Sequence, residues 1–172
     1  MTDISGLSDR QLLKLYSDIE GQLRKLEIIC SASNPAGDLA EHLFCKAFEW
    51  HRADKSQAHF DAIGPAPLNL RYQVKSRRII GDRSNGSRQL SAIRNLEQAL
   101  HFDFLAAVLF KEDYSIYKAA LVPHAVLLSL FEARKHISFQ EHTNSHRFML
   151  VDDIWKVDGV EDVTAKLMSV WH

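Results

Sequence analysis

The chain has 172 residues, of which 46% are apolar and 25% are charged, and its formal net charge is −1. These values exclude a disordered or fibrous chain and fit a single globular domain over residues 1–172. A nearly neutral chain also has no overall positive field, so any nucleic-acid binding has to come from a local cluster of Lys and Arg.

The cysteines, the first residues and the apolar stretches indicate in which cellular compartment the protein is expected. Cys30 and Cys45 have neither the spacing of metal ligands nor that of a disulfide framework, which favours a reducing, cytoplasmic setting. The first residues lack a basic segment followed by an apolar run, so no secretory signal is expected. No apolar stretch approaches the ~20 residues of a membrane span, and we therefore expect no membrane partner.

The first half of the chain predicts two helices and then two strands. Apolar residues recur three and four apart from Ser8 to about Ile29, which predicts an amphipathic helix within residues 1–30. A second helix is expected over roughly 36–50. Alternating patterns then predict strands over 58–63 and 68–79, joined by a turn at 64–67.

The second half continues with alternating types of element. After a polar loop at 81–87, the spacing of Leu90, Ile93, Leu96 and Leu100 predicts a short helix. Residues 123–172 form a helical and strand extension in this interpretation. The remaining expected elements are strands at 104–110, 114–122 and 147–150, and helices at 123–131, 152–155 and 160–170. This order implies an α/β fold with a mixed central sheet flanked by helices.

Glu41 is the first candidate functional residue. The second predicted helix has an apolar arc, and Glu41 projects into this arc between Phe44 and Phe48. A carboxylate on the core side is costly unless it is paired or bound to a metal. A buried salt bridge to an Arg or Lys is the alternative interpretation.

A second group of candidates lies on the two predicted strands. Gln73 and Lys75 share one face of their strand because side chains alternate. Asp61 lies in an apolar stretch on the preceding strand, and antiparallel pairing would bring it close to that face. Taken alone, the strand with Gln73 also fits a half-solvated antiparallel strand.

Together, Asp61, Gln73-x-Lys75 and the helical Glu41 resemble the PD-(D/E)XK nuclease-like superfamily. The resemblance covers about residues 36–122 and includes the segments 37–48, 59–64 and 71–78. Segment 73–77 resembles small bacterial members of uncertain role. The resemblance implies a restriction endonuclease-like core.

The resemblance also implies a metal-dependent nuclease of restriction or repair type that cleaves DNA with Mg²⁺ or Mn²⁺. Asp61 would be the central metal ligand, and the Gln73 side chain or the Val74 carbonyl would add an oxygen. Lys75 would steer the attacking water. Glu41 would hold a further water or a second cation. Cleavage of both strands by one site per chain would favour a homodimer.

A basic segment follows these residues and supplies candidate phosphate contacts. They are Arg77, Arg78, Arg83, Arg88 and Arg94. A solvated basic loop is an equally good interpretation of this segment.

The histidines and the common nucleotide-binding motifs are further features that could indicate a functional site. His142 and His146 have the spacing of two zinc ligands on one helical turn, but loop histidines are the better interpretation. His59 is expected to line the site beside Asp61. The sequence contains no Walker A loop and no GxGxxG motif, which disfavours an NTPase or a dinucleotide enzyme.

Two other functions remain open at this point. Gln73 is neutral where the superfamily usually has an acid, which motivates a catalytically inactive DNA-binding protein with the nuclease fold. The near-neutral charge and the N-terminal amphipathic helix motivate a protein-interaction module of a defence or toxin–antitoxin system, with a partner on the Leu12, Ile19 and Leu26 face.

Overall fold

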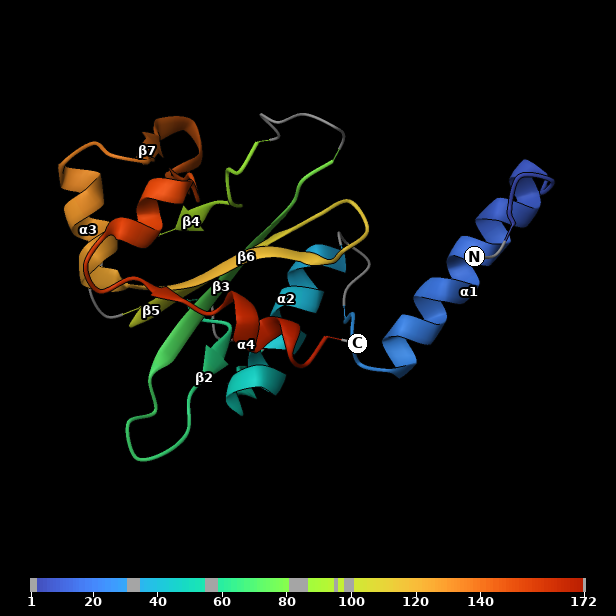
Figure 1. Ribbon diagram of the computed structural model, residues 1–172, viewed down its shortest axis with the longest axis horizontal. Helices are drawn as coiled ribbons and strands as arrows, with labels where there is room; N and C mark the ends of the chain where they lie inside the picture. Colours follow the sequence, from blue (N-terminus) through green and yellow to red (C-terminus); the bar gives the residue numbers. More distant parts are fainter. Residues whose placement is uncertain are drawn as a thin grey trace.

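The structure is a computed structural model (Figure 1) that describes residues 3–30, 35–54, 59–80, 87–94, 96–97 and 101–171. Its helices are α1 (Asp9–Lys25), α2 (Pro35–Phe48), α3 (His124–Glu132) and α4 (Thr164–Met168), with short 3₁₀ helices η1 (Glu141–Thr143) and η2 (Asp152–Lys156). Its strands are β1 (His51–Arg52), β2 (Ala62–Ile63), β3 (Arg71–Arg78), β4 (Ile93–Arg94), β5 (Phe104–Phe110), β6 (Ile116–Pro123), β7 (Ile137–Gln140), β8 (Ser145–Phe148) and β9 (Glu161–Asp162).

The centre of the fold is a six-stranded sheet in the order β1-β2-β3-β5-β6-β9. β3 and β5 are parallel, with Tyr72 opposite Phe104 and Arg78 opposite Phe110, whereas the other neighbours in this sheet are antiparallel. A second, three-stranded sheet has the order β4-β8-β7. The chain is therefore a mixed α/β protein with a mixed central sheet, as the sequence predicts.

Each face of the central sheet is covered by a separate apolar core. α2 and α4 pack on one face, where Leu43 and Phe44 meet Val108 of β5. α3, the small sheet and η2 cover the other face, where Leu109 of β5 meets Leu127 of α3. β5 is buried on both faces because its sequence is continuously apolar, and this pattern is typical of a strand at the centre of a sheet.

Polar contacts and aromatic rings fix the strand that carries the candidate site. The Arg71 backbone N–H and guanidinium both donate to the Asp103 carboxylate, which ties the start of β3 to the residue before β5. Tyr72 stacks on Trp50 with ring centroids 3.6 Å apart. A Cβ on Gly64 would lie 3.1 Å from the Tyr72 ring, so a larger residue here would crowd the ring that stacks on Trp50.

Several expected elements differ from the observed ones. The helix predicted over 90–100 is wrong in its described part, because Ile93 and Arg94 form β4 and pair with β8. The last helix is shorter than expected, since Glu161 and Asp162 form β9. β1 and β7 were not predicted at all. Two-residue strands such as β1 contain too few residues to show a period of two.

α1 differs from the other long elements in standing away from the body of the protein (Figure 1). No residue of α1, all of which the structure describes, is buried. Among the described residues, no helix has the length and apolar content needed to cross a membrane.

Candidate functional site

Asp61 lies where β2 stops pairing with β3. Ala62 and Ile63 pair with Tyr72 and Arg71, and one residue earlier the Asp61 backbone N–H still donates to the Tyr72 carbonyl at 2.8 Å. The next N–H on this edge of β3, that of Val74, donates to the Asp61 side chain instead of to a strand backbone: Asp61 Oδ2 accepts it at 2.7 Å. The carboxylate therefore occupies the edge of β3 in place of a further strand residue.

Lys75 projects toward the same carboxylate. Its Nζ lies 3.9 Å from Asp61 Oδ2, and the Lys75 side chain is only 16% exposed. A half-buried ammonium is costly without a counter-charge, and Asp61 supplies one. The structure thus brings Asp61 and Lys75 together across β2 and β3, as their positions on antiparallel strands suggest.

Glu41 reaches this site from α2. Burial is the largest cause that raises the pKa of its carboxyl, and the negative charge of Asp61 is the next; with Arg52 and Lys75 acting in the opposite direction, the pKa is about 7. Its side chain stays 30% exposed, so it lies at the rim of the apolar arc rather than inside it. An acid with a pKa near neutrality beside a second acid is typical of a functional site.

Gln73 supplies a buried oxygen at the same strand. The residue is 7% exposed, and its Oε1 has no hydrogen-bond partner among the residues that the structure describes. A buried amide oxygen without a partner costs about 1–3 kcal/mol. Because Gln73 and Lys75 extend from the same face of β3, this oxygen is a candidate ligand for a cation near Asp61.

The Val74 carbonyl lies on the same edge of β3 as the Asp61 carboxylate. The N–H and C=O of one strand residue point to the same side, and the Val74 N–H points to Asp61. The oxygens that Asp61, Glu41, Gln73 and Val74 offer are hard donors, which fit Mg²⁺ or Mn²⁺ and fit zinc poorly. Within the described ranges no group of three or more His, Cys, Asp or Glu could hold a metal ion.

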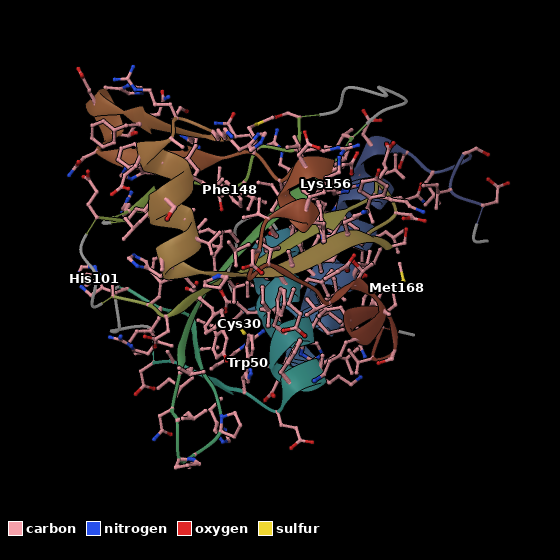
Figure 2. The ribbon with its side chains drawn as sticks, turned by 60° about the vertical axis from the view of Figure 1, so that its left-hand side comes forward. Cys30, Trp50, His101, Phe148, Lys156 and Met168 are labelled. Atoms are coloured by element: carbon pink, nitrogen blue, oxygen red, sulfur yellow. The ribbon has the colours of Figure 1, made fainter. Side chains whose placement is uncertain are left out.

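Arg52 of β1 is a site residue that the sequence interpretation missed. Its Nε lies 3.9 Å from Glu41 Oε2. Its two terminal nitrogens donate to Cys30 Sγ at 2.8 Å and to the Asp38 carbonyl at 2.9 Å. Figure 2 shows Cys30, which accepts one of these hydrogen bonds, and Trp50 beside α2. Only the closeness of β1 to the end of α2 could have indicated this role.

Replacing Arg52 should change the protonation of Glu41. Arg52 lowers the pKa of the Glu41 carboxyl, so we expect Arg52→Gln to raise that pKa above about 7. Carboxyl-detected NMR titration of metal-free protein measures it directly. Arg134→Gln, which changes an exposed Arg after α3, serves as the control. An unchanged or lower Glu41 pKa in Arg52→Gln would contradict this role.

The arginines predicted to contact phosphate fall into two groups. Arg78 donates to the Glu112 carbonyl and lies 4.3 Å from the centre of the Tyr114 ring. Arg88 is 3.2 Å from Asp152 and donates to the Tyr117 hydroxyl. Arg77 and Arg94 are exposed, and neither forms an ion pair with a described residue. Arg83 lies outside the described residues.

The histidines form no zinc site of the kind considered from the sequence. His142 lies in η1 and His146 in β8, so they do not share a helical turn. His146 is buried between Phe131 and Phe139, and burial lowers the pKa of its ring. His59 stacks on His101 with ring centroids 3.7 Å apart, a contact that the sequence did not indicate.

Comparison with known proteins assigns no family to the chain. No protein-family model matches the sequence, and no curated protein matches it. The interpretation of the site therefore depends on the geometry of Glu41, Asp61, Gln73 and Lys75.

Proposed function

We propose that the chain is a metal-dependent nuclease that hydrolyses DNA phosphodiester bonds and has a restriction endonuclease-like core over residues 36–122. The observation that carries this proposal is the convergence of charged groups from three elements. Asp61 Oδ2 lies 3.9 Å from Lys75 Nζ, and the charges of both residues act on Glu41 of α2. Two acids and a Lys that act on one another, with a buried amide oxygen on the same strand as the Lys, would supply the parts that metal-assisted phosphodiester hydrolysis requires.

The residues have separate roles in this proposal. Asp61, Glu41, the Gln73 side chain and the Val74 carbonyl would hold the divalent cation. Bound there, Mg²⁺ or Mn²⁺ would polarise the scissile phosphate and make an attacking water more acidic. Lys75 orients that water and stabilises negative charge that develops on the phosphate oxygens. Arg52 keeps Glu41 close to the other acid and offsets part of their mutual repulsion.

The open edge of β3 supports access of a phosphate backbone. β2 pairs only with Arg71 and Tyr72, so no described strand pairs with this edge beyond Val74. The exposed Arg77 follows on the same strand and on the same face as Lys75. A nucleic-acid strand that approached this edge would meet the two cations in succession.

Calorimetric titration and plasmid cleavage together test the proposal. We expect Mn²⁺ or Mg²⁺ to bind with one class of site and to support nicking of supercoiled plasmid. A chelator should abolish both signals. Absence of metal binding in wild-type protein would overturn the metal site, and metal binding without cleavage of DNA would overturn the nuclease function.

A second candidate function is DNA binding without cleavage. Gln73 contributes no negative charge, and two carboxylates with a neutral amide bind Mg²⁺ more weakly than three carboxylates do. The absence of a larger acidic group among the described residues favours this candidate. In that case the exposed basic residues would carry the function.

Substitutions of the exposed arginines and of an arginine that already contacts other protein groups should differ in their effect on DNA binding. We expect Arg77→Ala and Arg94→Ala each to weaken binding about uniformly across sequences and to lower the salt dependence by about one charge. Arg88→Ala should have a smaller effect on affinity, because its guanidinium is already engaged by Asp152 and Tyr117. Fluorescence anisotropy over a range of salt concentrations checks this, and equal slopes in all three variants would contradict it.

A further inference from the structure

We propose that α1 is a dimerisation helix that pairs antiparallel with α1 of a second copy of this chain. The observation that prompts this inference is an apolar face of α1 that stays exposed among the residues that the structure describes. Tyr16 is 57% exposed, Ile19 49% and Leu26 54%, although α1 is a regular helix of 17 residues. The proposal does not depend on the nuclease function.

The spacing of the apolar residues on this face of α1 fits another helix as the partner. Apolar side chains recur at alternating intervals of four and three residues, and we call this row the α1 seam; it consists of Leu12, Tyr16, Ile19, Leu23 and Leu26. Alternation of four and three is the repeat of two helices packed side by side. A second α1 presents an identical repeat and therefore matches the seam along its whole length.

The charges of α1 favour a protein partner over a membrane or nucleic-acid surface. Its sequence contains four basic and three acidic residues. Lys14 pairs with Asp18 at 2.7 Å and Arg24 with Glu20 at 3.3 Å, so much of the positive charge is already balanced within the helix. A helix that lies on an anionic surface instead has a polar face rich in unbalanced Lys and Arg.

The ends of α1 favour the antiparallel arrangement. Asp9 and Arg10 lie in the first turn, whereas Arg24 and Lys25 lie in the last turn. Antiparallel pairing brings Asp9 of one helix toward the basic last turn of the other and aligns the helix dipoles favourably. It also places the two bodies at opposite ends of the helix pair, since the body joins α1 only at its C-terminal end (Figure 1).

The low stability expected of α1 as an isolated helix gives a further reason for a partner. Most helices in proteins gain their stability from packing of an apolar face, and helices of about 12–15 residues are marginal alone in water. α1 has a capping box at Ser8 and Gln11, which helps it to start. No residue of α1 is buried within its own chain as described, and packing of the seam against a second copy would provide that burial.

Sedimentation equilibrium of the full chain over a wide concentration range tests the dimer. We expect a reversible monomer–dimer equilibrium in wild-type protein, and Ile19→Asp should raise the dissociation constant by at least about 100-fold. Ser17→Asp adds the same charge outside the seam and should leave the dimer intact. A wild-type monomer at all concentrations, or equal effects of both substitutions, would overturn the proposal. Thermal unfolding of the body should change little in either variant because α1 buries no residue.

Cysteine cross-linking tests the orientation. In a chain with Cys30→Ser and Cys45→Ser, we expect Ile19→Cys to form disulfide-linked dimers under mild oxidation, because position 19 lies near the middle of the seam. Leu12→Cys should not cross-link to itself, since antiparallel pairing would place the two copies of position 12 about 20 Å apart. Efficient Leu12→Cys cross-linking would show a parallel pair and overturn the antiparallel arrangement.

Discussion

Asp61→Asn should abolish metal-dependent cleavage of DNA while the protein stays folded, with a lower free energy of unfolding because Lys75 loses its counter-charge. The substitution removes the negative charge that would hold the cation, and we expect the cleavage rate to fall by at least about 100-fold. The amide oxygen of Asn can still accept the Val74 N–H, which Asp61 Oδ2 accepts at 2.7 Å. Single-turnover cleavage and chemical denaturation measure the two effects separately.

Two further variants make the Asp61→Asn experiment decisive. Asp61→Ala should also lose cleavage, but it leaves the Val74 N–H without its acceptor and should destabilise the fold by about 1–3 kcal/mol. Asp158→Asn removes an exposed acid outside the site and should change neither quantity. Wild-type cleavage by Asp61→Asn would exclude Asp61 from the reaction.

Glu41→Gln should stabilise the metal-free protein at alkaline pH. Burial and the charge of Asp61 raise the pKa of Glu41 from 4.5 to about 7, so the folded state holds this proton more tightly than the unfolded state does. The stability associated with the proton is complete below pH ~4.5 and is lost as the pH rises through ~7, a difference of about 3 kcal/mol. Gln has nearly the same shape and carries no charge, so it avoids this loss.

Thermal unfolding at several pH values in the presence of a chelator checks this prediction. At pH ~8 we expect Glu41→Gln to melt about 6–12 °C above wild type, and the gap should close toward pH ~4.5. Glu49→Gln changes an exposed acid just after α2 and serves as the control. A Glu41→Gln protein no more stable than wild type at pH ~8 would contradict the raised pKa. A variant that gains stability but loses metal binding would show that this carboxylate is kept for function.

The fold was predictable where the sequence is periodic over enough residues. The apolar arc of α2 and the continuous apolar run of β5 each extend over many residues, and both elements occur as predicted. The region of β4 was misassigned because Leu90, Ile93 and Leu96 have helical spacing. In the structure all three are buried, and Ile93 is paired with His146 of β8, a residue distant in sequence. Such long-range pairing leaves no local signal.

The candidate site was predictable to a similar extent. Strand alternation suggested that Asp61 and Lys75 approach each other, and helical periodicity indicated that Glu41 faces the core side. Arg52 escaped notice because its strand has two residues. The contacts of Arg78 and Arg88 depend on Tyr114 and Tyr117, which lie on a distant hairpin. Sequence spacing alone does not distinguish an arginine held by the protein from one free to reach a phosphate.

The hydrogen bond from the Val74 amide to Asp61 gives the protein a built-in spectroscopic reporter. Because this amide donates to the carboxylate itself, its proton chemical shift and its rate of exchange with solvent follow the charge on that carboxylate. A single backbone resonance therefore records the state of the site in solution, without any label or added substrate. The same resonance can be followed in every variant that preserves the contact between Val74 and residue 61.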